Sequence, residues 1–410
     1  MIYKRHLAIP AGLAMALLCA TPVMAQTTTV QCNDTSVLPN PVYMAGSSAF
    51  EPTLKQLAAQ IRAKQNISII YSLVSSCTGV ADIADPTQTL TGTADYYTFP
   101  SVDAGASGTA AISTCTLATG TSALIGVSDV FYDSCPVSGP MPAAMGEWQG
   151  PVQSMLIIVP KANVTTTALS YLQAAAIFGC GAKGLQTPFT VDTSIEVRTQ
   201  TSGTQTMIGA AIGVPPASFK GVQNSSGGNL VTALLALRDP QSAIGILAAD
   251  AYDPKRSTLN SVAFQGVGQT KAYYADSDAT TLDKKNVRDG HYVIQGPVHF
   301  FTGLTNGQPT ATAKKVLDWL TGTVPIDASD TTNTGYISTV ALAGDVPQCA
   351  MKVKINKDGG LFSPSTPTTS CNCFFDKTVT KSSTPPAGCV ACTSDSQCTG
   401  GKHCQTGYCE

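Results

Sequence analysis

The residues best suited to chemistry in this chain lie between Arg198 and Thr204, in the run Arg-Thr-Gln-Thr-Ser-Gly-Thr. The guanidinium of Arg198 is a planar fork of N–H donors that matches two oxygens of a tetrahedral oxyanion. Ser202 and Thr204 add hydroxyl groups, and Gly203 lets the backbone approach a small ligand closely. Taken alone, the same run would also fit an ordinary capped helix with a surface arginine.

This run lies where a strand gives way to a helix. Residues 194–197 are typical of a short strand, and residues 205–212 carry apolar side chains at helical spacing. Ser202 or Thr204 can cap the helix, which leaves free N–H groups facing outward at the positive end of the helix dipole. A junction of this kind is a suitable binding site for an anion.

Three earlier junctions have the same character, because each follows a predicted strand and is rich in small polar residues. Their strands are predicted at 42–45, 67–74 and 123–127, and they carry Gly46 to Ala49, Ser75 to Gly79, and Ser128 with Asp129. Pro52 and the spacing of Leu54, Leu57 and Ile61 predict a helix after the first of them.

Strands and helices alternate along most of the chain, which favours an α/β architecture with ligands at the carboxyl ends of strands. The apolar run 155–159 predicts a buried, parallel strand. A helix is expected to follow it with Leu169, Leu172 and Ala176 on one face, whereas residues 85–121 look like a surface insertion. Further elements are predicted at 230–237 (helix), 243–248 (strand), 298–301 (strand) and 313–320 (helix).

The first residues predict export. Residues 1–25 carry two basic side chains before an apolar run from Leu7 to Val23, a pattern that predicts a secretory signal cleaved after Ala25. Cys19 lacks the small preceding residue of a lipoprotein signal, which favours soluble export to the periplasm or cell surface. No later run is long enough for a membrane span, so no membrane insertion is expected after signal removal.

The remaining chain has 22 basic and 26 acidic residues, a formal charge of −4. A weakly acidic protein without a basic cluster is a poor candidate for nucleic-acid binding.

Thirteen cysteines remain after Cys19, and in an exported chain they indicate disulfides. Six lie in the body, at 32, 77, 115, 135, 180 and 349, and seven lie at 371, 373, 389, 392, 398, 404 and 409. Because the number is odd, one thiol is free, is paired between chains, or bridges body and tail in a way that the sequence leaves open. The pair Cys389 and Cys392 has zinc-type spacing, but export favours a structural disulfide.

Four of these segments, in order, resemble the periplasmic phosphate-binding proteins of phosphate ABC importers. The matching segments are Gly46 to Pro52, Tyr71 to Val80, Gly126 to Asp129, and Arg198 to Thr204. The resemblance covers roughly residues 40–345 and implies a two-lobed type II periplasmic binding protein fold with a hinge.

The resemblance also implies the site. The implied phosphate ligands are Ser48, Ala49, Ser76 and Asp129 from the first lobe, and Arg198, Ser202, Gly203 and Thr204 from the second. The first lobe is expected to be 41–132 with 293–350, and the second 133–292. An N-terminal arm (26–40), a Ser/Thr/Pro-rich linker (351–388) and a small disulfide-rich tail (389–410) complete the predicted organisation.

The sequence departs from the family pattern in three places. Gln200 occupies the position of an aspartate that usually orients the arginine, and a neutral amide lends no charge. The insertion between Ser76 and Asp129 is longer than usual, and the cysteine-rich tail is foreign to the family.

The leading hypothesis is a monomeric, non-enzymatic binding protein for inorganic phosphate, working with an ABC transporter permease and requiring no cofactor or metal. A cell-surface protein that reuses the fold for another oxyanion or a protein partner, with the tail as anchor or adhesion module, is the alternative. An enzyme is disfavoured, because His291, His299 and His403 all lie outside the four loops.

Overall fold

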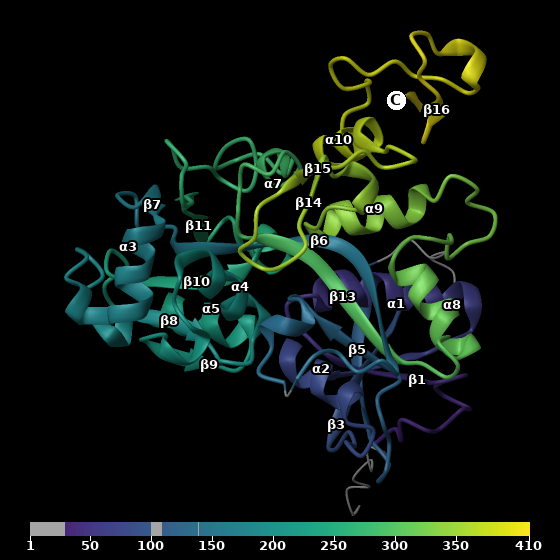
Figure 1. Ribbon diagram of the computed structural model, residues 1–410, viewed down its shortest axis with the longest axis horizontal. Coiled ribbons are helices and arrows are strands. Elements are labelled where there is room, and N and C mark those ends of the chain that lie inside the picture. The colour runs from purple at the N-terminus through teal and green to yellow at the C-terminus, as the bar shows by residue number, and fades with distance from the viewer. Residues whose placement is uncertain (1–28, 100–108, 138) are drawn as a thin grey trace, which may run out of the picture.

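The computed structural model describes residues 29–99, 109–137 and 139–410. The predicted signal, residues 1–25, lies outside the described residues. Two lobes lie side by side, one built mainly from the N-terminal third of the chain and one from its middle, with the C-terminal segment above them (Figure 1). In the described part of the chain, no helix combines the length and apolar character needed to cross a bilayer.

One large mixed sheet runs through both lobes. In spatial order its strands are β4 (Ala111–Thr116), β3 (Thr93–Thr98), β2 (Ile69–Leu73), β1 (Val42–Gly46), β5 (Ile125–Ser128), β13 (Gln295–Gly303), β6 (Met145–Pro160), β10 (Ile244–Ala248), β8 (Ile195–Arg198) and β9 (Val222–Asn224), with β11 (Leu259–Ser261) also paired to β6. Smaller pairs are β7 (Ala168–Ser170) with β12 (Ala263–Gln265), and β16 (Cys404–Gln405) with β17 (Tyr408–Cys409).

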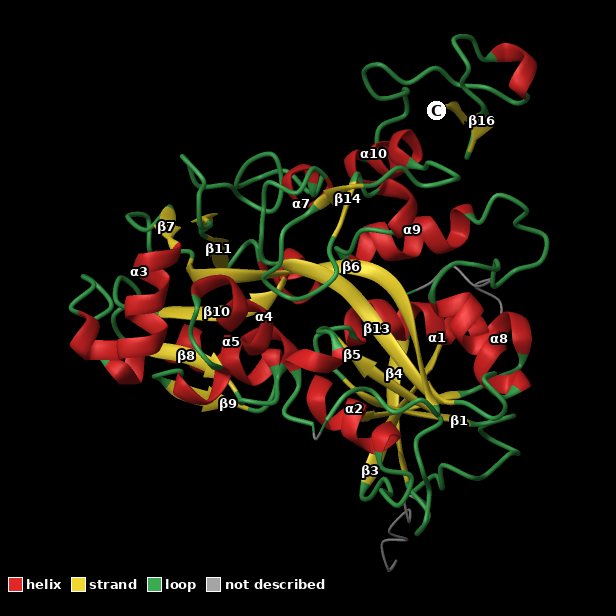
Figure 2. Cartoon of the chain, in the orientation of Figure 1, coloured by secondary structure: helices red, strands yellow, loops and turns green. Residues whose placement is uncertain are grey.

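Helices cover the sheet and connect its strands (Figure 2). They are α1 (Glu51–Gln65), α2 (Ser76–Ala84), α3 (Tyr171–Ala175), α4 (Gly203–Ile212), α5 (Gly227–Ala236), α6 (Ala249–Tyr252), α7 (Lys285–Arg288), α8 (Ala311–Leu320), α9 (Thr334–Ala343) and α10 (Asn372–Thr380).

In the first lobe, β1 pairs in parallel with both β2 and β5. Helix α1 begins as predicted with Pro52 in its first turn and buries its apolar face, including Leu54 and Ile61. It ends at Asn66, whose left-handed backbone (φ 54°) stops the helix. The expected surface insertion contains the antiparallel strands β3 and β4, which extend the edge of this sheet.

In the second lobe, β10, β8 and β9 are parallel, and α4 and α5 connect them. Two predictions here are wrong. The apolar run 155–159 is buried, but it belongs to β6, which is antiparallel to β10. The predicted helix face is also interrupted, because Leu169 lies in β7 and Leu172 is 63% exposed on α3.

The chain passes between the lobes inside β6. Its residues up to Ser154 pair with β13, and Met155 to Ile158 pair with β10. The crossing therefore lies near Val152 to Met155, later than the predicted boundary at residue 133, because one continuous strand serves both lobes. Strand β13 makes the return crossing, starting at Gln295 opposite Ser154.

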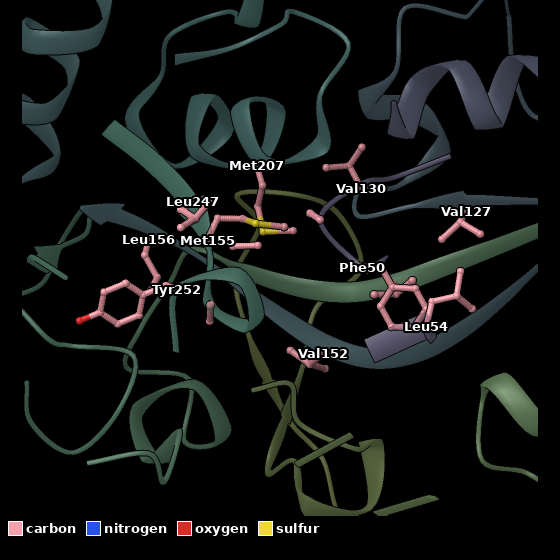
Figure 3. Packing of buried hydrophobic residues seen from close by; sticks show 14 of the residues in the cluster. Phe50, Leu54, Val127, Val130, Val152, Met155, Leu156, Met207, Leu247 and Tyr252 are labelled. Atoms are coloured by element: carbon pink, nitrogen blue, oxygen red, sulfur yellow. The ribbon is translucent and has the colours of Figure 1, made fainter. Parts of the chain in front are cut away.

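The apolar core is continuous across this crossing (Figure 3). On one side it contains Phe50, Leu54, Val127 and Val130, on the other Leu156, Leu247 and Tyr252, with Val152, Met155 and Met207 between them. The two crossing strands are thus held by packing as well as by backbone hydrogen bonds.

The segment 351–388 differs from the predicted linker, because much of it is folded against the body. It forms a hairpin of β14 (Val353–Lys354) and β15 (Ser363–Pro364), followed by α10. In the loop between β14 and β15, the Asp358 carboxylate accepts hydrogen bonds from the Phe131 N–H at 2.9 Å and the Ser134 hydroxyl at 2.6 Å.

Helix α10 is anchored by one buried face. Cys371, Phe375 and Val379 recur every four residues and are all buried, although the segment as a whole is polar. Arg288 pairs with Asp376, and its guanidinium carbon lies 4.7 Å from the centre of the Phe375 ring.

Six disulfides cross-link the described residues. They are Cys32–Cys115, Cys77–Cys135, Cys349–Cys371, Cys373–Cys389, Cys392–Cys404 and Cys398–Cys409. The sequence left open whether the odd cysteine is free or whether body and tail are bridged, and both occur in the described residues. Cys349–Cys371 joins the body to the C-terminal segment, and Cys180 is a free, exposed thiol. Cys389 and Cys392 each pair with a different cysteine.

We expect α10, but not the last module, to stabilise the body. A chain ending at Lys354 loses the buried Phe375 and leaves Arg288 buried without Asp376, so its free energy of unfolding should fall by on the order of 3 kcal/mol or more. A chain ending at Lys381 with Cys373→Ser should stay within about 1 kcal/mol of the full chain. Urea unfolding of all three checks this, and equal stability of the two shortened chains would contradict it.

Candidate functional site

The predicted site residues all lie at carboxyl ends of strands or at the starts of the helices that follow. Ser48 and Ala49 follow β1, Ser76 begins α2, Asp129 follows β5, Arg198 ends β8, and Ser202 to Thr204 lead into α4. Because both lobes turn these ends toward each other, the four loops form one site.

Asp129 is the acidic centre of the site and is 1% exposed. Its Oδ2 accepts hydrogen bonds from the hydroxyls of Ser47 at 2.6 Å and Ser76 at 3.0 Å. Burial raises the pKa of Asp129, and the two serine hydrogen bonds and the charge of Arg198 act in the opposite direction. Asp129 does not cap a helix, because the next helical turn begins only at Tyr132.

Arg198 is the basic centre and is 3% exposed. Its Nε donates to the carbonyl of Asn224 at 3.3 Å, and its Nη2 donates to the carbonyl of Ser225 at 3.0 Å and the hydroxyl of Ser48 at 3.1 Å. Burial lowers the pKa of Arg198 to about 10, against the attraction of Asp129. The guanidinium is therefore still charged at neutral pH.

Two backbone carbonyls orient Arg198 in the place of the family's usual aspartate. Gln200, which occupies that position, is exposed. The carbonyls of Asn224 and Ser225 fix the guanidinium without adding a negative charge. The positive charge of Arg198 is thus less neutralised than a neighbouring carboxylate would make it.

The lobes are closed over this site. The Gly203 N–H donates to Ser76 Oγ at 3.1 Å, and the Cys77 N–H donates to the Thr201 carbonyl at 3.2 Å. A Cβ on Gly203 would lie 2.4 Å from Ser76 Oγ and 2.6 Å from Asp129 Oδ2, so only glycine fits here. A hollow of about 660 Å³ between α1 and α9 reaches the end of the first loop at Pro52, but none of the eight predicted ligand residues lines it.

Two polar side-chain atoms at the site are not used within the described part of the protein. The first turns of α1 and α4 have no side-chain cap, contrary to the expectation that Ser202 or Thr204 caps α4. Thr204 Oγ1 and Asp129 Oδ1 are buried without a hydrogen-bond partner among the described residues. Buried polar groups rarely stay unpaired, so these atoms point to a small polar ligand. One cation, hydroxyls, N–H groups and one carboxyl suit a tetrahedral oxyanion.

Ser47 is a site residue that the sequence analysis missed. Besides its bond to Asp129, its Oγ accepts the Ala49 N–H at 3.0 Å, and its carbonyl accepts the Tyr71 hydroxyl at 2.6 Å. Ser47 therefore joins the first loop to Asp129. The only sequence signal was its position beside Ser48.

Two of the three described histidines are engaged elsewhere: His291 stacks on Tyr273, and His403 pairs with Asp395. His299 lies opposite Ser128 in the sheet, next to Asp129; its Nδ1 pairs with Glu147, and its Nε2 is buried without a partner in the described residues.

In the described residues, the one close group of three metal-type ligands is Cys392, Cys398 and Cys409, and their sulfurs are in disulfides.

The fold defines a class, a two-lobed α/β fold in which loops of both lobes meet around one buried arginine and one buried aspartate. No family model matches the chain, and no curated protein matches its sequence. Solved structures do match. One is described as the substrate-binding protein of a phosphate ABC transporter from Clostridium perfringens, with bound phosphate. It has 15% identity and a TM-score of 0.51, over 75% of this chain and 99% of the other.

Two further structures are similar over comparable lengths. An ABC-type phosphate transport receptor from Vibrio cholerae has 13% identity and a TM-score of 0.44, over 74% of this chain and 99% of its own. The periplasmic phosphate-binding protein PfluDING, solved with phosphate, has 14% identity and a TM-score of 0.46, over 75% and 90%. The predicted fold class is confirmed, and at these identities the ligand must be argued from the site itself.

The tight fit at Gly203 predicts a loss of stability in Gly203→Ala. The added methyl group meets Ser76 and Asp129, so the variant should lose about 1–3 kcal/mol of unfolding free energy. Gly228→Ala is the matched control, because a Cβ there meets only Ser226 Oγ at 3.8 Å, and it should be neutral or slightly stabilising. Urea titrations that rank the two variants equally would show that the lobes do not close here.

Proposed function

We propose that this chain is an exported, extracytoplasmic binding protein that captures inorganic phosphate between its lobes. The observation that carries the proposal is that a buried arginine of one lobe and a buried aspartate of the other lie close enough to influence each other's pKa, beside the unpartnered Thr204 Oγ1 and Asp129 Oδ1. The fold of phosphate-binding proteins supports it.

In this proposal, each lobe replaces part of the hydration shell of the anion. The ligands are Ser48, Ala49, Ser76 and Asp129 from one lobe and Arg198, Ser202, Gly203 and Thr204 from the other. Arg198 supplies the charge, and the hydroxyls and helix N–H groups supply the remaining donors. Closure of the hinge brings the two half-sites together and excludes water.

Asp129 gives the site its selectivity. A carboxylate repels an anion unless the anion carries a proton that the carboxylate can accept in a hydrogen bond. Phosphate carries such a proton near neutral pH and sulfate does not, so an unmade hydrogen bond facing a like charge disfavours sulfate.

An ABC transporter permease is the proposed partner, and a monomer is the proposed state. The alternative is a cell-surface protein with the tail as its contact module. One observation favours this alternative. The module 389–410 projects from the body (Figure 1), and its Gln405 and Glu410 side chains accept hydrogen bonds from backbone N–H groups of residues 370–373. Because the module projects from the body, most of its surface is free to contact a protein partner in this alternative.

Arg198→Ala should abolish most of the affinity for phosphate. The variant leaves a buried anion facing neutral donors and Asp129, which costs on the order of 3 kcal/mol or more of binding free energy. Arg238→Ala, at an exposed position of the same lobe, is the control and should bind like the wild type. If calorimetric titration shows that Arg198→Ala loses less than about 1 kcal/mol of phosphate-binding free energy, the binding site lies elsewhere.

Asp129→Asn should relax the choice of anion. The wild type should bind phosphate and arsenate and exclude sulfate at millimolar concentration. The variant should bind phosphate only moderately more weakly and admit some sulfate, because an amide can donate to an unprotonated oxygen. Competition titrations measure this, and equal exclusion of sulfate by both proteins would rule out Asp129 as the selector.

A further inference from the structure

A second group of buried acids lies behind the site, where β6 crosses between the lobes. We call it the hinge cluster, and it consists of Thr53, Gln153, Asp250 and Asp345. Val152 N–H donates to the Val346 carbonyl at 2.7 Å, and Val346 N–H donates back at 3.0 Å. This two-way bridge places Gln153 and Asp345 beside the crossing.

Gln153 connects the hinge cluster to the oxyanion site. Its Nε2 donates to the carbonyl of Ala49 at 3.3 Å and to Asp250 Oδ2 at 3.2 Å. Ala49 is a proposed ligand of the first lobe, whereas Asp250 lies in α6, directly after β10 of the second lobe. Gln153 itself is fully buried, so this amide spans the lobes without contact to solvent.

The two acids approach each other from opposite sides of the hinge. A Cβ on Gly344 would lie 2.9 Å from Asp250 Cα, so the backbone just before Asp345 lies directly against Asp250. Asp345 Oδ2 accepts the Thr53 hydroxyl at 2.6 Å, and Asp250 Oδ1 accepts the Ala251 N–H at 2.8 Å. Asp345 Oδ1 is buried without a partner in the described chain.

The cations nearby are already neutralised by other acids. Lys284 and Arg256 each form ion pairs with both Asp253 and Asp276. Two cations and two carboxylates balance one another, and this network contributes no net charge to the hinge cluster.

Most of the charged or titratable neighbours oppose ionisation of the two acids. Asp129 and Asp253 both act against ionisation of Asp250 and Asp345, whereas Lys284 partly favours ionisation of Asp345. Tyr336, on α9, is neutral because burial and Asp345 raise its pKa. Two buried carboxyls without their own cation cannot both ionise, so the pair must hold a proton.

We propose that Asp250 and Asp345 share a proton across the closed hinge, and that phosphate binding therefore draws this proton from solvent. The proposal rests on the proposed function for its ligand. Opening moves Asp250 with the second lobe and Asp345 with the first, so both acids become hydrated and can ionise separately. Closure around the anion restores the shared proton.

The direction of the pH dependence follows from the buried acids. Burial raises the pKa of Asp345 to about 7, and burial together with Asp345 raises the pKa of Asp250 well above its usual range. In the open form both should return toward about 4. The closed form thus binds more protons between these two pKa values, so closure becomes steadily less favourable as the pH rises from about 4 to about 7 and levels off above that.

The test is calorimetric titration with inorganic phosphate at pH 6, 7 and 8, each in two buffers of different ionisation heat. Asp345→Asn imitates the protonated acid and needs no proton to close, so it should bind more tightly than the wild type at every pH tested, by on the order of 100-fold at pH 6 and on the order of 1,000-fold at pH 8. The variant should also take up fewer protons at pH 7 than the wild type. Because phosphate itself titrates in this range, the difference between the two proteins is the quantity that matters.

Asp250→Asn should behave in the same way, and Asp95→Asn is the control. Asp95 is a partly buried acid of β3 whose pKa is also raised by burial, and its variant should follow the wild type at every pH. If Asp345→Asn instead weakens binding equally at all pH values, or takes up as many protons as the wild type, the shared proton is refuted.

A ligand-free measurement separates this proposal from the proposed function. The radius of gyration from X-ray scattering should rise between pH 6 and pH 8 in the wild type and stay constant in Asp345→Asn. If no phosphate binds but this difference in scattering appears, Asp345 titrates with opening of the hinge and the proposed ligand is wrong. If phosphate binds and neither the scattering nor the proton count differs, the phosphate site stands and the hinge proposal fails.

Discussion

The structure depends on keeping one cation and one carboxyl buried and facing each other from different lobes. Water is excluded only when the lobes are closed, and closure in turn requires Gly203 to lie against Ser76 and Asp129. Arg198 keeps its charge because backbone carbonyls solvate it, and Asp129 is held by two hydroxyls. The long strand β6 joins the two lobes behind these contacts, because it pairs with β13 on one side of the crossing and with β10 on the other.

Most of the site could be predicted from sequence because its parts are local. Each loop has its own strand before it, and three of the four have an α-helix after it, so Ser76 or Ser202 is marked by a few neighbouring residues. Ser47 was missed because its role is to bind Asp129, 82 residues away. The carbonyls that hold Arg198 carry no side-chain signal at all, and Asp250 and Asp345 meet only through tertiary structure.

The errors in the fold prediction also have physical causes. An apolar run such as 155–159 indicates that a strand is buried but not whether it runs parallel or antiparallel to its neighbours. Strand β6 is long because it pairs with strands of both lobes. The segment 351–388 is polar on average, so its composition suggested a linker. Its buried face has the regular spacing of Cys371, Phe375 and Val379, a signal that average composition hides.

The disulfides of the C-terminal segment, joined by short stretches of backbone at 371–373 and 389–392, give a covalent path from Cys349 to the last module that bypasses most of the intervening chain. Cys349–Cys371 and Cys373–Cys389 each close a loop, and Cys392–Cys404 and Cys398–Cys409 overlap beyond them. A protease that cut the exposed chain between 382 and 388 would leave the last module attached until a reductant acted. Pulling on the C-terminus would likewise load the body at residue 349, a few residues from the hinge.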